Sequence, residues 1–66
     1  MSGDERLPEV GDLVQDAARD HEAVVTDIRF GSVYVLRPRY GAPSQTWEAG
    51  VLQLAILARR GEWRTP

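Results

Sequence analysis

The sequence predicts a single small all-β domain of five antiparallel strands, and three observations lead to that prediction. The 66 residues are enough for one domain but not for two. Short runs rich in β-branched and apolar residues alternate with segments that contain glycine or proline. The chain has no cysteine and one histidine, so neither a disulfide nor a four-ligand zinc site can stabilise it. We therefore expect the core to consist of apolar packing alone.

The domain is expected to span residues 10–58, between a flexible N-terminal arm (1–9) and a C-terminal tail rich in arginine and tryptophan (59–66). Gly11-Asp12 predicts a turn, and the residues that follow it, up to Asp16, predict a short first strand. Residues 17–21 are polar and too few for a stable helix, so we expect a connector there.

The clearest strand covers residues 22–30, where β-branched residues alternate with polar ones. One face of this strand is expected to carry Val24, Thr26, Ile28 and Phe30. Gly31-Ser32 then predicts a two-residue hairpin turn of type II′, because glycine leads the link between two apolar runs. Residues 33–37 should form the second strand of this hairpin.

The C-terminal third is less uniquely specified. Residues 38–45 contain two prolines and a glycine and predict a loop, after which residues 46–48 return as a short strand. We favour a 3₁₀-like turn over 49–52 and a last strand over 53–57, because Gly50 weakens a helix start. The alternative is a β-meander followed by a short helix from about residue 49 to residue 60, in which Val51, Leu54, Ala55 and Ala58 share one face.

This order of strands, hairpin, loop and tight turn resembles an SH3-like barrel. Within it, Gly11-Asp12-Leu13-Val14, the strand from Val24 to Ile28 and Val33-Tyr34-Val35 resemble the KOW segment of ribosomal and transcription-associated proteins, over residues 10–36. The chain departs from that segment at Glu22-Ala23, where KOW segments have glycine, and in having no lysine. Leu36-Arg37-Pro38, the loop and Trp47-Glu48 also resemble small, uncharacterised SH3-like barrel proteins of high-GC bacteria.

Charge is distributed unevenly along the chain. Residues 1–33 carry three arginines and eight acidic residues (3 − 8 = −5), whereas residues 34–66 carry five arginines and two acidic residues (5 − 2 = +3). An anionic partner would therefore meet the second half and a cationic partner the first.

Catalytic and metal-binding residue sets are missing from the sequence. His21 lies between Asp20 and Glu22 in the polar connector and is expected to be a solvated surface residue. The serines lack the Gly-x-Ser-x-Gly context of a nucleophile elbow. Asp12, Asp16, Asp20 and Glu22 miss the spacing of a calcium loop, so we expect a solvated acidic face. We predict no catalytic residue, no cofactor and no metal.

The predicted binding surface combines arginine with exposed aromatic residues, a pairing common at interface hot spots. It has two parts, the start of the 38–45 loop and the C-terminal tail, where arginine can hold phosphate while an aromatic ring stacks. Its members are Arg37, Arg39, Tyr40, Arg59, Arg60 and Trp63. Trp47, flanked by Thr46 and Glu48 in a short strand, is instead expected in the core.

Two functions follow as hypotheses. The first is a non-enzymatic protein-protein adaptor or regulator, acting alone or as a homodimer, because a barrel this small has difficulty covering apolar residues on both strand faces. The second is a KOW-like module that binds nucleic acid or the ribosome through its arginines. The chain has no apolar run long enough to span a membrane, and we expect it to be cytoplasmic.

Overall fold

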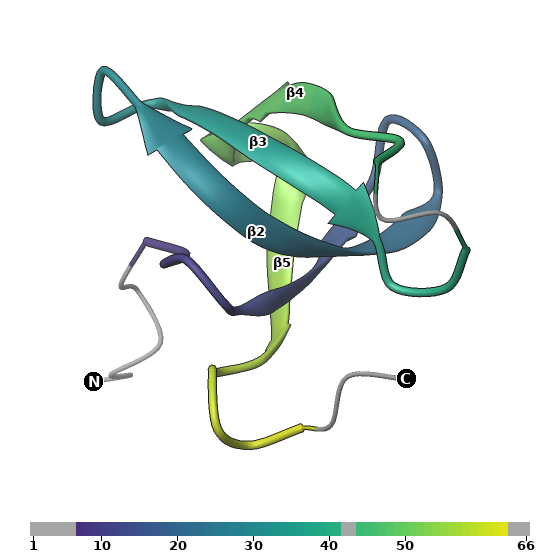
Figure 1. The fold of residues 1–66 in the computed structure, drawn as a ribbon. Coiled ribbons are helices and arrows are strands. Elements are labelled where there is room, and N and C mark those ends of the chain that lie inside the picture. The colour runs from purple at the N-terminus through teal and green to yellow at the C-terminus, as the bar shows by residue number, and fades with distance from the viewer. Residues whose placement is uncertain (1–6, 42–43, 64–66) are drawn as a thin grey trace.

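The computed structural model describes residues 7–41 and 44–63. Five strands make up the fold: β1 (Leu13–Asp16), β2 (His21–Arg29), β3 (Val33–Pro38), β4 (Trp47–Gly50) and β5 (Leu54–Ala58) (Figure 1). A short 3₁₀ turn, η2 (Val51–Gln53), connects β4 to β5. The all-β prediction is therefore confirmed, and the alternative of a helix over residues 49–60 is wrong. No helix in the described part of the chain could cross a membrane.

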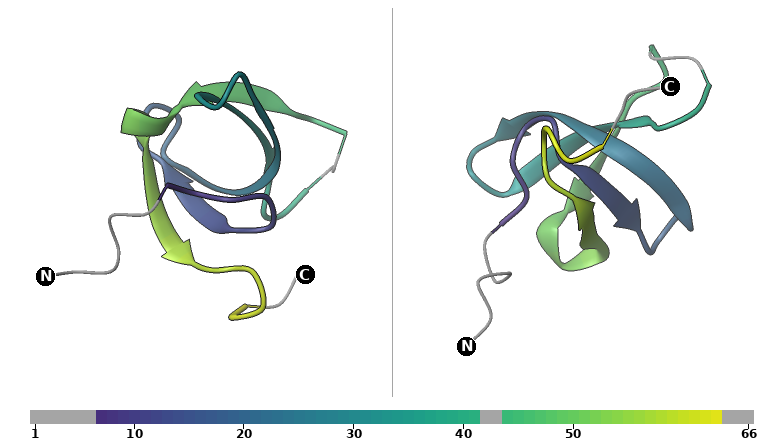
Figure 2. Two further views of the ribbon diagram at one scale, coloured as in Figure 1. Left: turned by 90° about the vertical axis from the view of Figure 1, so that its left-hand side faces the viewer. Right: turned by 90° about the horizontal axis from the view of Figure 1, so that it is seen from below.

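All five strands belong to one antiparallel sheet with the order β4-β3-β2-β1-β5. The sheet is strongly curved, so that the end of β4 and the start of β5 lie on the same side of the molecule, where η2 joins them (Figure 2). These two strands are the sheet's edges, and they do not pair with each other. Among the described residues the sheet is therefore open rather than closed into a barrel.

The hairpin between β2 and β3 forms as predicted, but its turn differs from the expected one. Arg29 pairs with Val33, and the amide of Ser32 donates to the carbonyl of Arg29 (3.1 Å). The two central residues are Phe30 (φ 56°) and Gly31 (φ 71°). Two positive φ angles define a type I′ turn, so the type II′ prediction is wrong. Phe30 stands at the tip of the hairpin with 94% of its surface exposed.

A β-bulge changes which side chains of β2 face the core. Val25 pairs with Leu36 while Asp27 pairs with Val35, so Thr26 has no opposite residue. The hydroxyl of Thr26 donates instead to the carbonyl of Val35 (3.1 Å). Because a bulge shifts the alternation by one residue, the expected face of Val24, Thr26, Ile28 and Phe30 does not form. Val25 and Ile28 contact the core instead.

The core lies inside the curve of the sheet. Its buried members come from the four strands β1 to β4: Val14, Ala23, Val25, Tyr34, Leu36 and Ala49. Partly buried apolar residues pack against them from β2, β4, η2 and β5: Ile28, Trp47, Val51, Leu54 and Ile56. No residue of β5 is fully buried. The core is therefore well covered by β1 to β3 and incompletely covered where β5 passes over it.

Candidate functional site

The predicted binding surface is partly assembled around Arg39. Its guanidinium lies 5.1 Å from the centre of the Tyr40 ring and 5.8 Å from that of the Trp63 ring. Its Nη1 donates to Glu22 Oε1 at 2.6 Å, and this hydrogen bond is the main cause that raises the pKa of Arg39. The start of the β3–β4 loop and the C-terminal tail therefore meet at Arg39. The positive charge of Arg39 is already paired, however, and its buried Nε has no hydrogen-bond partner.

Arg59 and Arg60 serve a different region, the turn before β1. Arg59 Nη1 donates to Asp12 Oδ2 (2.6 Å) and to the carbonyl of Leu7 (3.2 Å). The amide of Arg60 donates to Asp12 Oδ1 (2.8 Å). The Arg60 side chain passes so close to Gly11 (φ 95°) that a Cβ there would lie 2.6 Å from Arg60 Cδ. These two arginines are structural contacts of the Gly11-Asp12 turn.

Arg37 and Trp63 complete the predicted set. Arg37 lies in β3, where its Nη1 donates to the carbonyl of Pro38 (3.3 Å). The Trp63 indole donates to the carbonyl of Gly11 (3.2 Å), so the tail folds back to residue 63. Five of the six residues therefore form two clusters, Arg39 with Tyr40, and Arg59 with Arg60 at the Gly11-Asp12 turn, which Trp63 connects. Arg37 bonds instead to the adjacent Pro38.

Asp12 is buried, with 1% of its surface exposed, which corrects the prediction of a solvated acidic face. Burial by itself would raise its pKa. Hydrogen bonds from the amides of Glu9 and Arg60, together with the Arg59 guanidinium, outweigh burial and leave the pKa below its ordinary value of 3.8. Asp12 is thus a charged anchor that ties the end of β5 to the start of β1.

Asp16 is the second buried carboxylate, also 1% exposed, at the other end of β1. Its Oδ2 accepts the indole N–H of Trp47 (2.7 Å), and its Oδ1 accepts the amide of Ala18 (2.9 Å). Trp47 packs against the core but is only partly buried. The Arg19 guanidinium lies 4.7 Å from its ring centre, and the edge of His21 approaches it.

A small pocket of about 240 Å³ opens beside the Trp47 ring. Its lining residues are Arg19, His21, Pro38, Gln45, Thr46 and Trp47. His21 is exposed, as expected from its polar surroundings in the sequence. In the parts of the chain that are described, no group of three or more His, Asp or Glu side chains could hold a metal ion.

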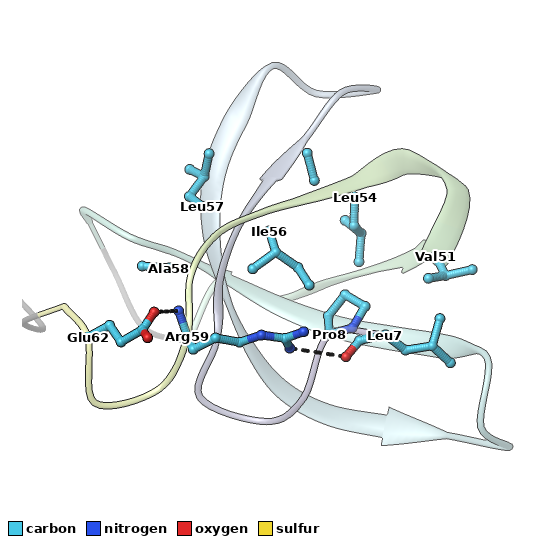
Figure 3. Close-up of a pocket in the computed structure, with 10 residues that line it drawn as sticks. Leu7, Pro8, Val51, Leu54, Ile56, Leu57, Ala58, Arg59 and Glu62 are labelled. Carbon is cyan, nitrogen blue, oxygen red and sulfur yellow. Dashed lines mark hydrogen bonds between the residues drawn. The ribbon is translucent and has the colours of Figure 1, made fainter. Parts of the chain in front are cut away.

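A larger open groove of about 520 Å³ runs along β5 (Figure 3). Eight of its ten lining residues are apolar, and the full set is Leu7, Pro8, Val51, Leu54, Ala55, Ile56, Leu57, Ala58, Arg59 and Glu62. Every residue from 54 to 59 lines it. Because neighbouring side chains of a strand point to opposite faces, only a groove at the strand's edge can contact all of them. Sequence reasoning missed this groove, and the available signal was the uncharged run over residues 51–58.

The backbone of β5 also has free hydrogen-bonding groups on this edge. The amide of Ala17 donates to the carbonyl of Gln53 (2.8 Å), so these residues form a hydrogen-bonded pair directly beyond Asp16–Leu54, the last pair of the β1–β5 ladder. Pairs alternate in antiparallel ladders, so Ala55 bonds to β1 while Leu54 and Ile56 direct their backbone groups outward. The amide of Leu54 is used within η2, where it donates to Val51. Ile56 is thus the interior residue of β5 with both its N–H and its C=O directed outward and unpaired by any described strand.

The site that the structure assembles is therefore the outer edge of β5, an unpaired backbone flanked by apolar side chains. Leu54 and Ile56 point to the side of Pro8, and Leu57 points to the opposite side (Figure 3). Leu57 leaves 48% of its surface exposed. Comparison of the chain with protein-family models, curated proteins and solved structures finds no match.

Proposed function

We propose that the chain is a non-enzymatic protein-binding module, an adaptor or regulator, that pairs its partner's backbone with the outer edge of β5. The observation that carries this proposal is the unpaired, uncharged edge from Leu54 to Ala58 beside the groove. Strand addition at such an edge obtains affinity from main-chain hydrogen bonds and specificity from alternate side-chain pockets. Leu54 and Ile56 supply the pockets, and the backbone of Ile56 supplies the hydrogen bonds.

The exposed apolar surface beside this edge supports a protein partner. Besides Leu57, Leu7 in the groove lining exposes 55% of its surface, and Leu52, in the η2 turn that precedes β5, exposes 99%. A protein surface that brings apolar side chains together around unpaired backbone groups is typical of interaction sites.

For the fold, we propose that the curved sheet is an open form of an SH3-like barrel. Two observations support this finer classification. The meander from β1 to β4 is followed by a 3₁₀ turn, and the last strand returns to pair with β1. Both features agree with the resemblance drawn from the sequence.

Binding of nucleic acid through the arginines, as in a KOW-like module, is the alternative that we favour less. Arg39 is paired with Glu22, Arg59 with Asp12 and Arg29 with Glu48. Phosphate would therefore have to displace carboxylates before it could bind these side chains. Titration of labelled RNA and DNA at low salt tests this alternative, which predicts binding that weakens steeply as salt is added.

Photo-crosslinking in cells of the native host tests the proposed protein-binding edge. A benzoyl-phenylalanine at position 57, beside the edge, should yield defined adducts, whereas one at position 30, on the exposed hairpin tip, should not. Ile56→Pro should abolish the adducts because proline removes the outward N–H, while Ile56→Ala, which keeps it, should retain a substantial part of them. Adducts from position 30 alone, or adducts that Ile56→Pro leaves unchanged, would contradict the proposal.

A further inference from the structure

The edge of β5 has a geometry that fits one particular partner. We infer that a second copy of this chain pairs with it, β5 against β5 in antiparallel orientation, about a two-fold axis through Ile56. This inference rests on the proposed function, because it names the partner for the same edge. The product is a symmetric dimer in which the two five-stranded sheets become one continuous sheet.

Among two-fold axes that pass through a hydrogen-bonded pair, the backbone selects the one at Ile56. A two-fold axis that passes through a hydrogen-bonded pair requires a residue with both N–H and C=O directed outward and free. Leu54 does not meet this requirement, because its amide already donates to Val51. Ile56 meets it, and each Ile56 would donate to and accept from the Ile56 of the second copy.

The side chains of β5 are complementary in size under this symmetry. With Ile56 opposite its own counterpart, Leu54 lies opposite Ala58 and Leu57 lies opposite Ala55 of the second copy. Each off-centre pair thus joins a large residue to a small one. Such pairs fill the space between strands without overlap, because opposite side chains in antiparallel pairs stand about 5 Å apart. The β1–β5 register shifts between Val14–Ile56 and Leu13–Ala58, which leaves Leu57 without a partner on β1. Ala55 and Leu57 are nevertheless exposed while Leu54, Ile56 and Ala58 are partly buried, so the two sets lie on opposite faces of β5.

Charge also favours this arrangement. Residues 51–58 carry no charge, so no charged residue is buried between the two strands. Arg59 lies opposite Gln53 of the second copy, six positions from the other Arg59, which separates the two guanidinium-bearing positions by about 20 Å along the strand. A parallel pairing would instead bring the two Arg59 residues side by side. The antiparallel pair is therefore the one without like-charge contact.

Disulfide trapping tests the pairing and its register, without background because the chain has no native cysteine. Ala55→Cys and Leu57→Cys place the thiol on the exposed face of β5, where it does not disturb the core. In the inferred register residue 55 of one copy faces residue 57 of the other at a Cα separation of about 4.5 Å, which a disulfide spans. Identical positions lie diagonally at about 7–8 Å, which is too far.

Mild oxidation of an equal mixture of the two variants should therefore give a covalent dimer at least ten times faster than either variant alone. Equal rates in all three samples, or faster dimerisation of one variant alone, would overturn the register.

Sedimentation velocity of the unmodified chain should show twice the mass of one chain, with Ile56→Pro monomeric and Ile56→Ala still self-associating. A chain that stays monomeric at millimolar concentration would overturn the inference. If the chain is monomeric but position 57 gives adducts to a different protein, the proposed function still stands. If position 57 gives no adducts either, the proposed function is contradicted as well.

Discussion

The two edge strands of the sheet, β4 and β5, differ in the features that protect an edge strand from association. β4 is four residues long, ends in Gly50 and carries Glu48, which pairs with Arg29 at 3.0 Å. β5 has five apolar residues, no charge, no proline and a groove along its outer side. Proteins commonly protect edge strands from association by shortness and charge. β4 carries a charge and is the shorter strand, whereas β5, although its register with β1 shifts at Leu57, carries no charge, which supports β5 as the edge that associates.

The inner attachments of the same two strands are alike. Each is held to one end of β1 by a buried aspartate, Asp16 through the Trp47 indole and Asp12 through Arg59. Each carboxylate accepts a hydrogen bond from a distant part of the chain and another from a nearby amide, that of Glu9 for Asp12 and that of Ala18 for Asp16. The edges thus share one means of anchoring and differ in length and in what they present to solvent.

The largest expected effect comes from breaking the anchor of β5. Asp12→Asn removes the ion pair with Arg59 and leaves backbone donors of Glu9 and Arg60 without a charged acceptor. The free energy of unfolding should fall by about 3 kcal/mol, as for other broken buried ion pairs. Denaturant unfolding measures this change. Asp20→Asn, on an exposed turn residue, is the matched control and should change it by less than about 0.5 kcal/mol.

The anchor of β4 should contribute less. Trp47→Phe keeps a ring beside Arg19 but removes the N–H that donates to Asp16 Oδ2. One lost hydrogen bond to a charged acceptor should lower the free energy of unfolding by about 2 kcal/mol. The same denaturant measurement applies, and a loss larger than that of Asp12→Asn would reverse the ranking of the two anchors.

Acid should release the β5 anchor. The pKa of Asp12 is lower in the folded chain than its ordinary value of 3.8, so its ionised form stabilises the fold. This contribution is fully present above the unfolded-state value and is lost as pH falls through the folded-state value. Unfolding measured from pH 6 to pH 2 should therefore show a steeper loss for the unmodified chain than for Asp12→Asn. Parallel curves would show that Asp12 does not carry the linkage.

The smallest effect is expected at a site that belongs to neither edge. Phe30 occupies a positive-φ position of the β2–β3 turn while almost fully exposed. Asn adopts this conformation more readily, and Asn-Gly is the preferred type I′ pair. Phe30→Asn should raise the free energy of unfolding by about 0.5 kcal/mol. If β5 is the associating edge, the oligomeric state of this variant should match that of the unmodified chain.

Local pattern was enough to predict most elements of the fold. The apolar runs and Gly31 predict the hairpin, and Gly50 disfavours a helix after it. The turn type was wrong because Phe30, a poor residue for positive φ, takes the first central position. The faces of β2 were wrong because the bulge at Thr26 depends on pairing with β3, which no local pattern encodes.

The candidate site was harder to predict, because it depends on contacts between distant residues. Asp12 and Asp16 are charged and, from the sequence alone, were expected to be solvated. Their partners Arg59 and Trp47 lie 47 and 31 residues away in the sequence, and these contacts bury the two carboxylates. Arg59, one of the arginines expected to bind a partner, forms an ion pair with Asp12 that its sequence neighbours do not reveal. The groove at β5 depends on which strand forms the sheet's edge, and strand order is not encoded in the run of residues 51–58.

Amide hydrogen exchange at Ile56, followed as the concentration of the chain is raised, tests the central claim that the outer edge of β5 associates. In the dilute chain the Ile56 amide faces solvent and should exchange quickly, while the Ala55 amide, bonded to β1, should be protected. At high concentration the account predicts that Ile56 becomes protected and that the amides of β4 do not change. Protection that grows along β4 instead, or fast Ile56 exchange at every concentration in a chain that does associate, would contradict it.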